Sequence, residues 1–273
     1  MMKSILRFVT VFLVAGIAPC LVGQERPDRF LDSNGVNLRY IEQGAGEPVV
    51  LIHGFGGSAD DPWVKAGILQ ALAKNHRVLA LDCRGFGQSD KPSERKHYGQ
   101  EMALDVVRLL DHLKIPRAHI VGYSMGAAIA AKLVTMKPER FLTVVLGGYG
   151  ARLSWLAEES SSRQNDARYE QRAAELASGP GGRMDPGTIA RAAALRSFRE
   201  QRVTAAQMAA VRVPAISIIG TADEGIADVH ELKRVMPDLK LVTIDGADHD
   251  SARRRPEFLA TVEEFLKVNS HPK

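Results

Sequence analysis

Cysteine is scarce in this chain: its 273 residues include only Cys20 and Cys83. Cys20 falls in an N-terminal stretch that we expect the mature protein to lose, so an intramolecular disulfide is not expected. Cys83 follows an apolar run at residues 78–81, and we interpret it as a packed residue at a strand end. No cysteine and histidine cluster has metal-ligand spacing, so we expect neither a metal nor another cofactor.

An excess of one charge is also missing. Lysine and arginine number 36 against 32 acidic residues, which gives a formal net charge of +4. The positive charges are spread out, apart from a basic triplet at residues 253–255 that is typical of a solvated helix start. Nucleic acid is therefore not an expected partner.

Long hydrophobic runs are limited to one N-terminal stretch, and even that one is short for a membrane span. Lys3 and Arg7 precede an apolar run at residues 8–18, and small and then polar residues follow. This order is typical of a secretory signal peptide, which we predict over residues 1–24. We expect cleavage between Ala18 and Glu25, no stable membrane insertion afterwards, and a secreted or periplasmic protein. An uncleaved anchor or a lipid attached at Cys20 are the alternatives.

The rest of the chain alternates short apolar runs with segments of helical spacing. Runs without polar alternation are typical of strands buried on both faces of a parallel sheet. Alternation of such strands with helices predicts an α/β fold, with a mostly parallel central sheet and helices on both of its faces. The expected strands are residues 36–41, 49–52, 77–81, 118–121, 141–146, 215–219 and 239–244, and the expected helices include 63–74, 98–113, 226–235 and 256–268.

One segment departs from this alternation. Residues 151–211 are rich in Ala, Arg, Glu and Ser, lack a β-branched run, and predict several short helices. We interpret them as a helical cap inserted between two parts of one α/β core, residues 25–150 and residues 212–273. Peripheral decoration of the core is the alternative.

The most informative motif is Gly122-Tyr123-Ser124-Met125-Gly126. It lies between an expected strand and an expected helix, where the G-x-S-x-G pattern is typical of a nucleophile elbow. Such a tight turn leaves no room for bulky flanking residues and exposes the serine hydroxyl at its tip. An ordinary glycine-rich turn is the alternative.

Three residues that each follow an expected strand can complete a nucleophilic site. Ser124, Asp223 and His249 occur in the order nucleophile, acid, base that accompanies this elbow. An imidazole can take the serine proton during attack, and a carboxylate on its far nitrogen holds the tautomer. We therefore predict these three as the catalytic residues. Competitors for the acid remain, namely Asp228 first, then Glu224, and then Asp245, Asp248 and Asp250 beside His249.

A developing oxyanion needs hydrogen-bond donors that are already in place. We predict the backbone N–H groups of Met125, at the start of the elbow helix, and of Phe55, in the glycine-rich loop after residues 49–52. We place His53, Gly54 and Tyr123 in the substrate pocket, although the position of His53 before the glycine loop also favours a structural role. A phosphate loop is disfavoured because the loop lacks a Lys-Ser/Thr ending.

Taken together, the chain resembles an α/β-hydrolase-fold serine hydrolase of the carboxylesterase-like kind. The resemblance rests on five motifs in order: residues 53–58, residues 82–89, the elbow, Gly220-Thr221-Ala222-Asp223 and Gly246-Ala247-Asp248-His249. It implies an acyl-enzyme on Ser124, completed by Asp223 and His249, and a cap before Ala215. The order of these three residues, the oxyanion loop and the leader lead us to expect a secreted or periplasmic esterase whose substrate is a small-molecule ester with a small to medium acyl group.

The resemblance is weak for the substrate. Cleavage of a C–C bond, a lactone or an amide on the same three residues is the first alternative, and a slow-turnover, ligand-binding member of the fold is the second. The cap is short and unusually rich in Arg and Ala for this family. Its arginines at residues 163–172 either steer acidic substrates or form a solvated helix face.

Overall fold

The computed structural model describes residues 28–151, 159–178 and 185–270. The predicted signal peptide, residues 1–24, lies outside the described residues. So do two short pieces of the predicted cap. Among the described residues, no helix has the length and apolar character that crossing a bilayer requires.

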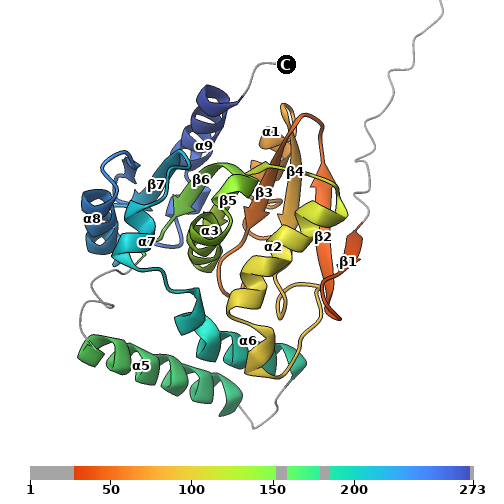
Figure 1. Ribbon diagram of the computed structural model, residues 1–273, viewed down its shortest axis with the longest axis vertical. Helices are drawn as coiled ribbons and strands as arrows, with labels where there is room; N and C mark the ends of the chain where they lie inside the picture. Colours follow the sequence, from red (N-terminus) through yellow and green to blue (C-terminus); the bar gives the residue numbers. More distant parts are fainter. Residues whose placement is uncertain (1–27, 152–158, 179–184, 271–273) are drawn as a thin grey trace, which may run out of the picture.

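An eight-stranded sheet forms the centre of the structure (Figure 1). Its spatial order is β1-β2-β4-β3-β5-β6-β7-β8. The first two strands pair antiparallel, β2 pairs antiparallel with β4, and all later pairs are parallel. The strands are β1 (Arg29–Asp32), β2 (Asn37–Gln43), β3 (Glu47–Ile52), β4 (His76–Leu81), β5 (Ala118–Tyr123), β6 (Phe141–Gly147), β7 (Ala215–Gly220) and β8 (Lys240–Ile244). This architecture confirms the predicted fold class.

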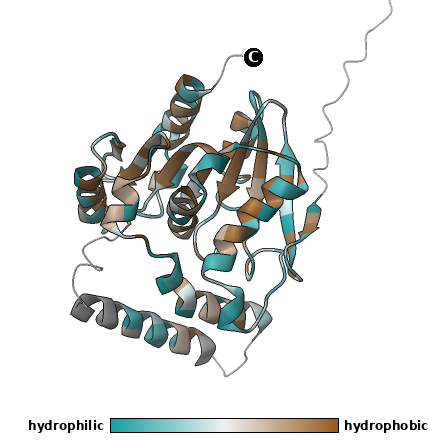
Figure 2. Ribbon diagram, in the orientation of Figure 1, coloured by the Kyte–Doolittle hydropathy of each residue, from teal (hydrophilic) through white to brown (hydrophobic). Residues whose placement is uncertain are grey.

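The central strands are buried on both faces, as their unbroken apolar runs predict. Val50 and Ile52 of β3 pack on the side of α2 (Gln100–His112) and α3 (Met125–Met136). Val49 and Leu51, which alternate with them, pack on the side of α1 (Ile68–Leu72) and α9 (Pro256–Asn269). Successive side chains of one strand thus supply two separate cores, and Figure 2 shows the central strands as strongly hydrophobic.

Two elements of the structure differ from the prediction. The helix expected over residues 63–74 is regular only over Ile68–Leu72. Gly67 precedes it with a φ of 75°, a left-handed conformation that interrupts a helix, while Trp63 is buried in an irregular turn. The edge strand β1 is not expected from the sequence, because only one of its four residues is buried and no apolar run marks it.

Helices between β6 and β7 form the region predicted as a cap. They are α5 (Glu159–Ser178), α6 (Pro186–Ser197), the 3₁₀ turn η3 (Phe198–Gln201) and α7 (Ala205–Ala209). Figure 1 shows α5 and α6 side by side at one end of the molecule. Small side chains form their seam, since Ala173 of α5 packs with Ala192 and Leu195 of α6.

The end of α6 is fixed to the core by buried polar contacts. The Gly99 N–H donates to the Ser197 hydroxyl at 2.9 Å, and the Gln201 side-chain amide contacts the Met102 sulfur at 3.1 Å. Met208 of α7 belongs to the main core cluster together with Leu232 of α8 (Ile226–Val235). The packing of α7 is therefore with the core, on the side of the sheet that α3 covers.

Candidate active site

The elbow forms as a strained turn between β5 and α3. Ser124 has a φ of 54° and a ψ of −113°, a conformation that non-glycine residues rarely adopt. A Cβ on Gly122 would collide with the Gly126 carbonyl, and a Cβ on Gly126 would collide with the Ile52 carbonyl. Both glycines are therefore required sterically. The Ser124 N–H donates to the Gly147 carbonyl at 2.7 Å, which holds the turn against β6.

The structure brings Ser124, His249 and Asp223 together in one line of hydrogen bonds. The Ser124 Oγ lies 2.9 Å from His249 Nε2, and His249 Nδ1 lies 2.7 Å from the Asp223 carboxylate. A carboxylate only accepts, so Nδ1 carries the ring proton and Nε2 is free to accept from the serine hydroxyl. Asp223 follows β7 and His249 follows β8, and the Ala222 N–H joins the two loops by donating to the Ala247 carbonyl at 3.0 Å.

Burial differs along this line. The Asp223 side chain is 4% exposed, whereas that of His249 is 44% exposed. The hydrogen bond that His249 donates to Asp223 raises the pKa of His249 above its ordinary value, and partial burial opposes this rise. The buried acid therefore stabilises a charged imidazole at a position that solvent and substrate can reach.

Two of the acids that competed for this role, both beside His249 in the chain, have other partners. Asp248 accepts from the Ser251 hydroxyl at 2.6 Å, and Asp250 pairs with Arg253 at 2.8 Å. Glu224 is exposed. Asp223 also accepts from the Gly225 N–H at 2.8 Å, which orients its carboxylate toward the ring.

The two N–H groups predicted as oxyanion donors belong to backbone close to Ser124. The Met125 N–H begins α3, and the Phe55 N–H belongs to the loop after β3; within the described part of the chain neither donates a hydrogen bond. A Cβ placed on Gly54 would lie 3.4 Å from the Ser124 Cβ, so this loop approaches the serine closely. The role of these two N–H groups as oxyanion donors stays a prediction.

Two of the predicted pocket residues need correction. The side chains of His53 and Tyr123 are both 0% exposed, so neither lines an open pocket. His53 Nδ1 contacts the Gly54 carbonyl at 2.7 Å, and its Nε2 accepts from the Cys83 N–H at 3.1 Å. Burial lowers the pKa of His53 and keeps the ring neutral. His53 therefore has a structural role in the glycine-rich loop after β3, as its position before the glycines also suggested.

A second glycine pair, Gly147-Gly148, packs beside the site, although its sequence signalled only a strand end. Gly148 has a φ of 57°, and a Cβ there would lie 3.0 Å from the Tyr123 ring and 3.1 Å from the His249 ring. A glycine pair ending a strand at the same sheet edge as the elbow is the signal that could have found it.

A sequence model described as the alpha/beta hydrolase fold matches residues 47–209, more than half of the chain. The chain belongs to the α/β-hydrolase fold family.

Individual relatives of this α/β hydrolase carry several different activities. The dihydrolipoyllysine-residue acetyltransferase component of the acetoin cleaving system of Cupriavidus necator is 42% identical over 119 residues, which are 43% of this chain and 31% of that protein. The 2-hydroxy-6-oxo-6-(2'-aminophenyl)hexa-2,4-dienoic acid hydrolase of Metapseudomonas resinovorans is 35% identical over 125 residues, 44% of this chain and 42% of that protein. This chain thus spans less than half the length of either relative.

A solved structure matches over much more of the α/β hydrolase. The crystal structure of a hydrolase from Pseudomonas aeruginosa PA01 superposes with a TM-score of 0.72 at 26% identity, and the match covers 90% of this chain and 99% of that one. The overall fold is therefore shared with that hydrolase over most of both chains.

Aromatic rings connect the Phe55 loop to these helices. The Phe55 ring packs edge-on against Phe86 at 5.4 Å and against Phe198 of η3 at 5.7 Å between centroids. Phe198 in turn packs against Tyr169 of α5 at 5.5 Å. No motif in the sequence pointed to Phe198.

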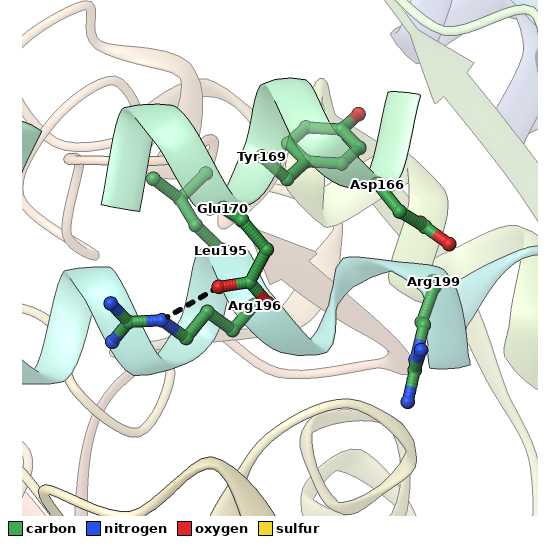
Figure 3. Close-up of a pocket in the computed structure, with 6 residues that line it drawn as sticks. All are labelled: Asp166, Tyr169, Glu170, Leu195, Arg196 and Arg199. Carbon is green, nitrogen blue, oxygen red and sulfur yellow. Dashed lines mark hydrogen bonds and ion pairs between the residues drawn. The ribbon is translucent and has the colours of Figure 1, made fainter. Parts of the chain in front are cut away.

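Between α5 and α6 lies a small cavity of about 20 Å³, lined by Asp166, Tyr169, Glu170, Leu195, Arg196 and Arg199 (Figure 3). Glu170 and Arg196 point toward one another across it and pair at 3.0 Å. Arg202 pairs with Asp166 at 2.6 Å. Both acids of α5 thus pair with arginines of the segment that follows it, and Arg168 and Arg172 of α5 are exposed. This arrangement favours a solvated helix face over a substrate-steering surface.

Proposed function

We propose that this α/β hydrolase is a serine hydrolase that cleaves carboxylic esters of small to medium acyl groups through an acyl-enzyme on Ser124. The hydrogen-bonded line Ser124–His249–Asp223 is the observation that carries the proposal. It supplies a nucleophile, a base and a group that orients the base, all at one sheet edge.

In the first half-reaction, the Ser124 Oγ attacks the ester carbonyl carbon while its proton passes to His249 Nε2. The carbonyl oxygen becomes an oxyanion, which the N–H groups of Met125 and Phe55 stabilise. The tetrahedral intermediate then collapses: the C–O bond to the leaving alcohol breaks, and His249 returns the proton to that oxygen. The acyl group stays on Ser124.

In the second half-reaction, water takes the place of the alcohol. His249 removes a proton from water as its oxygen attacks the acyl carbon, and the same two N–H groups bind the second oxyanion. Collapse releases the carboxylic acid and returns the proton to Ser124. Because Ser124, His249, the leaving alcohol and water account for every proton transfer in the two half-reactions, we propose that the reaction uses no cofactor.

Hydrolysis of a C–C bond is the second candidate. Its support is the 35% identical relative named as a hydrolase of a hexa-2,4-dienoic acid, which matches over part of its length. The same serine and histidine can serve that chemistry, in which the leaving group is a carbanion equivalent that must be protonated at carbon.

The test is hydrolysis of p-nitrophenyl esters from acetate to long acyl chains, run with wild type and Ser124→Ala in parallel. We expect wild type to turn over the shorter esters and the variant to fall to background. A folded wild type that is silent on esters but cleaves a 2-hydroxy-6-oxo-hexa-2,4-dienoate would replace the first candidate with the second. Tight binding without turnover of either would favour the ligand-binding alternative.

We also propose that residues 1–24 direct export of the protein and are removed from the exported, mature form. The supporting pattern is the positive, apolar and small-residue order of that segment. Mass spectrometry of the N-terminus from an expressing bacterium tests it, with an intact Met1 in the cytoplasmic fraction as the contradicting result.

A further inference from the structure

Tyr123 connects the proposed nucleophile to the proposed base by a route separate from the hydrogen bond between them. It immediately precedes Ser124, and its hydroxyl donates to the backbone carbonyl of His249 at 2.6 Å. The two bonded residues are 126 positions apart in the chain. One residue of the elbow therefore touches the backbone of the loop that carries the imidazole.

Close packing on several sides holds the Tyr123 ring in this position. The ring lies 5.6 Å from the His249 ring and 5.7 Å, edge-on, from the Phe258 ring of α9. The Arg253 guanidinium lies 5.6 Å over it. Gly147 and Gly148 lack the side chains that would otherwise occupy this space, since a Cβ on Gly147 would lie 2.6 Å from the tyrosine ring.

The histidine loop needs such a contact because much of it faces solvent. Asp245, Gly246, Asp248 and Asp250 are all exposed. Asp223 orients the imidazole through Nδ1, and the Ala222 N–H holds the loop at the Ala247 carbonyl, but neither bond acts on the backbone of His249 itself. The bond from Tyr123 acts on that backbone, at the histidine itself.

We propose that Tyr123 is a positioning residue, which fixes the His249 loop on the elbow so that Nε2 stays within hydrogen-bond distance of the Ser124 hydroxyl. This inference rests on the proposed serine hydrolase function. Tyr123 is 0% exposed and has no access to substrate, so its effect is on the geometry of proton transfer and not on substrate binding. Burial raises the pKa of Tyr123, which keeps its hydroxyl protonated and able to donate across the working pH range.

The chain offers a matched control for removing this hydroxyl. Tyr98 is also buried, at 1% exposed, and its hydroxyl donates to a backbone carbonyl, that of Pro92, at 2.7 Å. Tyr123→Phe and Tyr98→Phe therefore remove the same atom from the same kind of bond. They differ in whether the carbonyl belongs to the proposed base.

The experiment measures kcat, KM and the rate of labelling by a fluorophosphonate, which reports serine reactivity without substrate recognition. Wild type, Ser124→Ala, Tyr123→Phe and Tyr98→Phe are compared, with thermal melting to establish that each is folded. We expect Tyr123→Phe to lower kcat and labelling about tenfold with KM unchanged, the effect of a small misplacement of a catalytic group. We expect Tyr98→Phe to retain wild-type kcat and labelling.

Three results would overturn the inference. One is wild-type kcat and labelling in Tyr123→Phe, and another is an equal loss in Tyr98→Phe, which would indicate a general packing effect. A rise in KM at unchanged kcat would instead mean that Tyr123 acts on substrate binding. Turnover retained by Ser124→Ala would overturn the proposed function itself, and so separates its failure from that of the inference.

Discussion

The imidazole of His53, at the end of β3, accepts a hydrogen bond from the backbone N–H of Cys83, after β4, at 3.1 Å. The two residues are buried, and the bond ties together the loops that leave two neighbouring parallel strands. His53 also contacts the Gly54 carbonyl, one residue before the Phe55 N–H. The buried His53 ring thus helps to position the backbone N–H of Phe55, the proposed oxyanion donor.

Removing the His53 ring is expected to lower stability and activity together. In His53→Ala the Cys83 N–H loses its partner and a buried cavity opens, which we expect to cost ~3 kcal/mol of unfolding free energy. Urea unfolding and ester turnover measure the two effects. His230→Ala, an exposed histidine of α8, is the control and should change neither. An unfolding midpoint equal to wild type would contradict the supporting role.

The neutral state of His53 also predicts how stability depends on pH. Its folded pKa is lowered below the ordinary value of 6.5, so the unfolded chain binds more protons at low pH. The contribution of His53 to stability is therefore full above about pH 6.5 and is lost as pH falls below that value. Unfolding midpoints between pH 5 and pH 8 should decline toward pH 5 less steeply in His53→Ala than in wild type.

Activity should follow the ionisation of His249. The imidazole accepts a proton only when neutral, and the Asp223 hydrogen bond raises its pKa above 6.5. We expect kcat/KM to rise with pH through a midpoint above 6.5, and Asp223→Asn to move that midpoint to lower pH while lowering kcat. Asp248→Asn, which changes an exposed acid beside His249 that bonds to Ser251, should leave the midpoint in place. An unmoved midpoint in Asp223→Asn would refute the pairing.

Gly148 and Gly246 allow the steric requirement of the site to be separated from backbone strain. Their φ angles are 57° and 63°, but an added Cβ meets Tyr123 and His249 at Gly148 and nothing within 4 Å at Gly246. Both alanine variants should lose about 1 kcal/mol of stability from the unfavourable φ. Only Gly148→Ala should also lower kcat, by roughly tenfold through displacement of the imidazole. Equal kcat in the two variants would show that the contact tolerates a methyl group.

Phe198 is expected to affect substrate preference. Its ring bridges Phe55 and Tyr169, so Phe198→Ala removes the aromatic contact between the Phe55 loop and α5. We expect KM values across the p-nitrophenyl ester series to change by about threefold or more, because the ring removed is worth ~1 kcal/mol in each contact. Phe30→Ala, an exposed phenylalanine of the edge strand β1, should leave the series unchanged. An identical chain-length profile in Phe198→Ala would count against the bridge.

The parts of the structure that the sequence predicted are those with local causes. The runs in β3 and β5 signalled buried strands because both of their faces are covered, and Gly122 and Gly126 signalled the elbow because the turn excludes any side chain there. Ser124, Asp223 and His249 were found because each follows a strand at the same sheet edge. Their roles stay predictions, while their proximity is a property of the structure.

The parts that the sequence did not predict depend on contacts between distant residues. Tyr123 was expected in the substrate pocket, yet its hydroxyl donates to a carbonyl 126 positions away, and nothing local encodes that bond. The edge strand β1 is held by pairing with β2 and not by its own apolar pattern. The helix near Trp63 was overestimated because its spacing was helical while Gly67 adopts a left-handed conformation.

Because Cys83 is buried, the reactivity of its sulfur reports local opening of the native structure around it. It is 2% exposed, and burial raises the pKa of its thiol, so the reactive thiolate is scarce in the native state. A thiol reagent can modify it at an appreciable rate only when the loops after β3 and β4 separate. The rate at which a reagent modifies Cys83, followed by mass spectrometry, would therefore report how often the native structure opens locally at the carboxyl ends of β3 and β4.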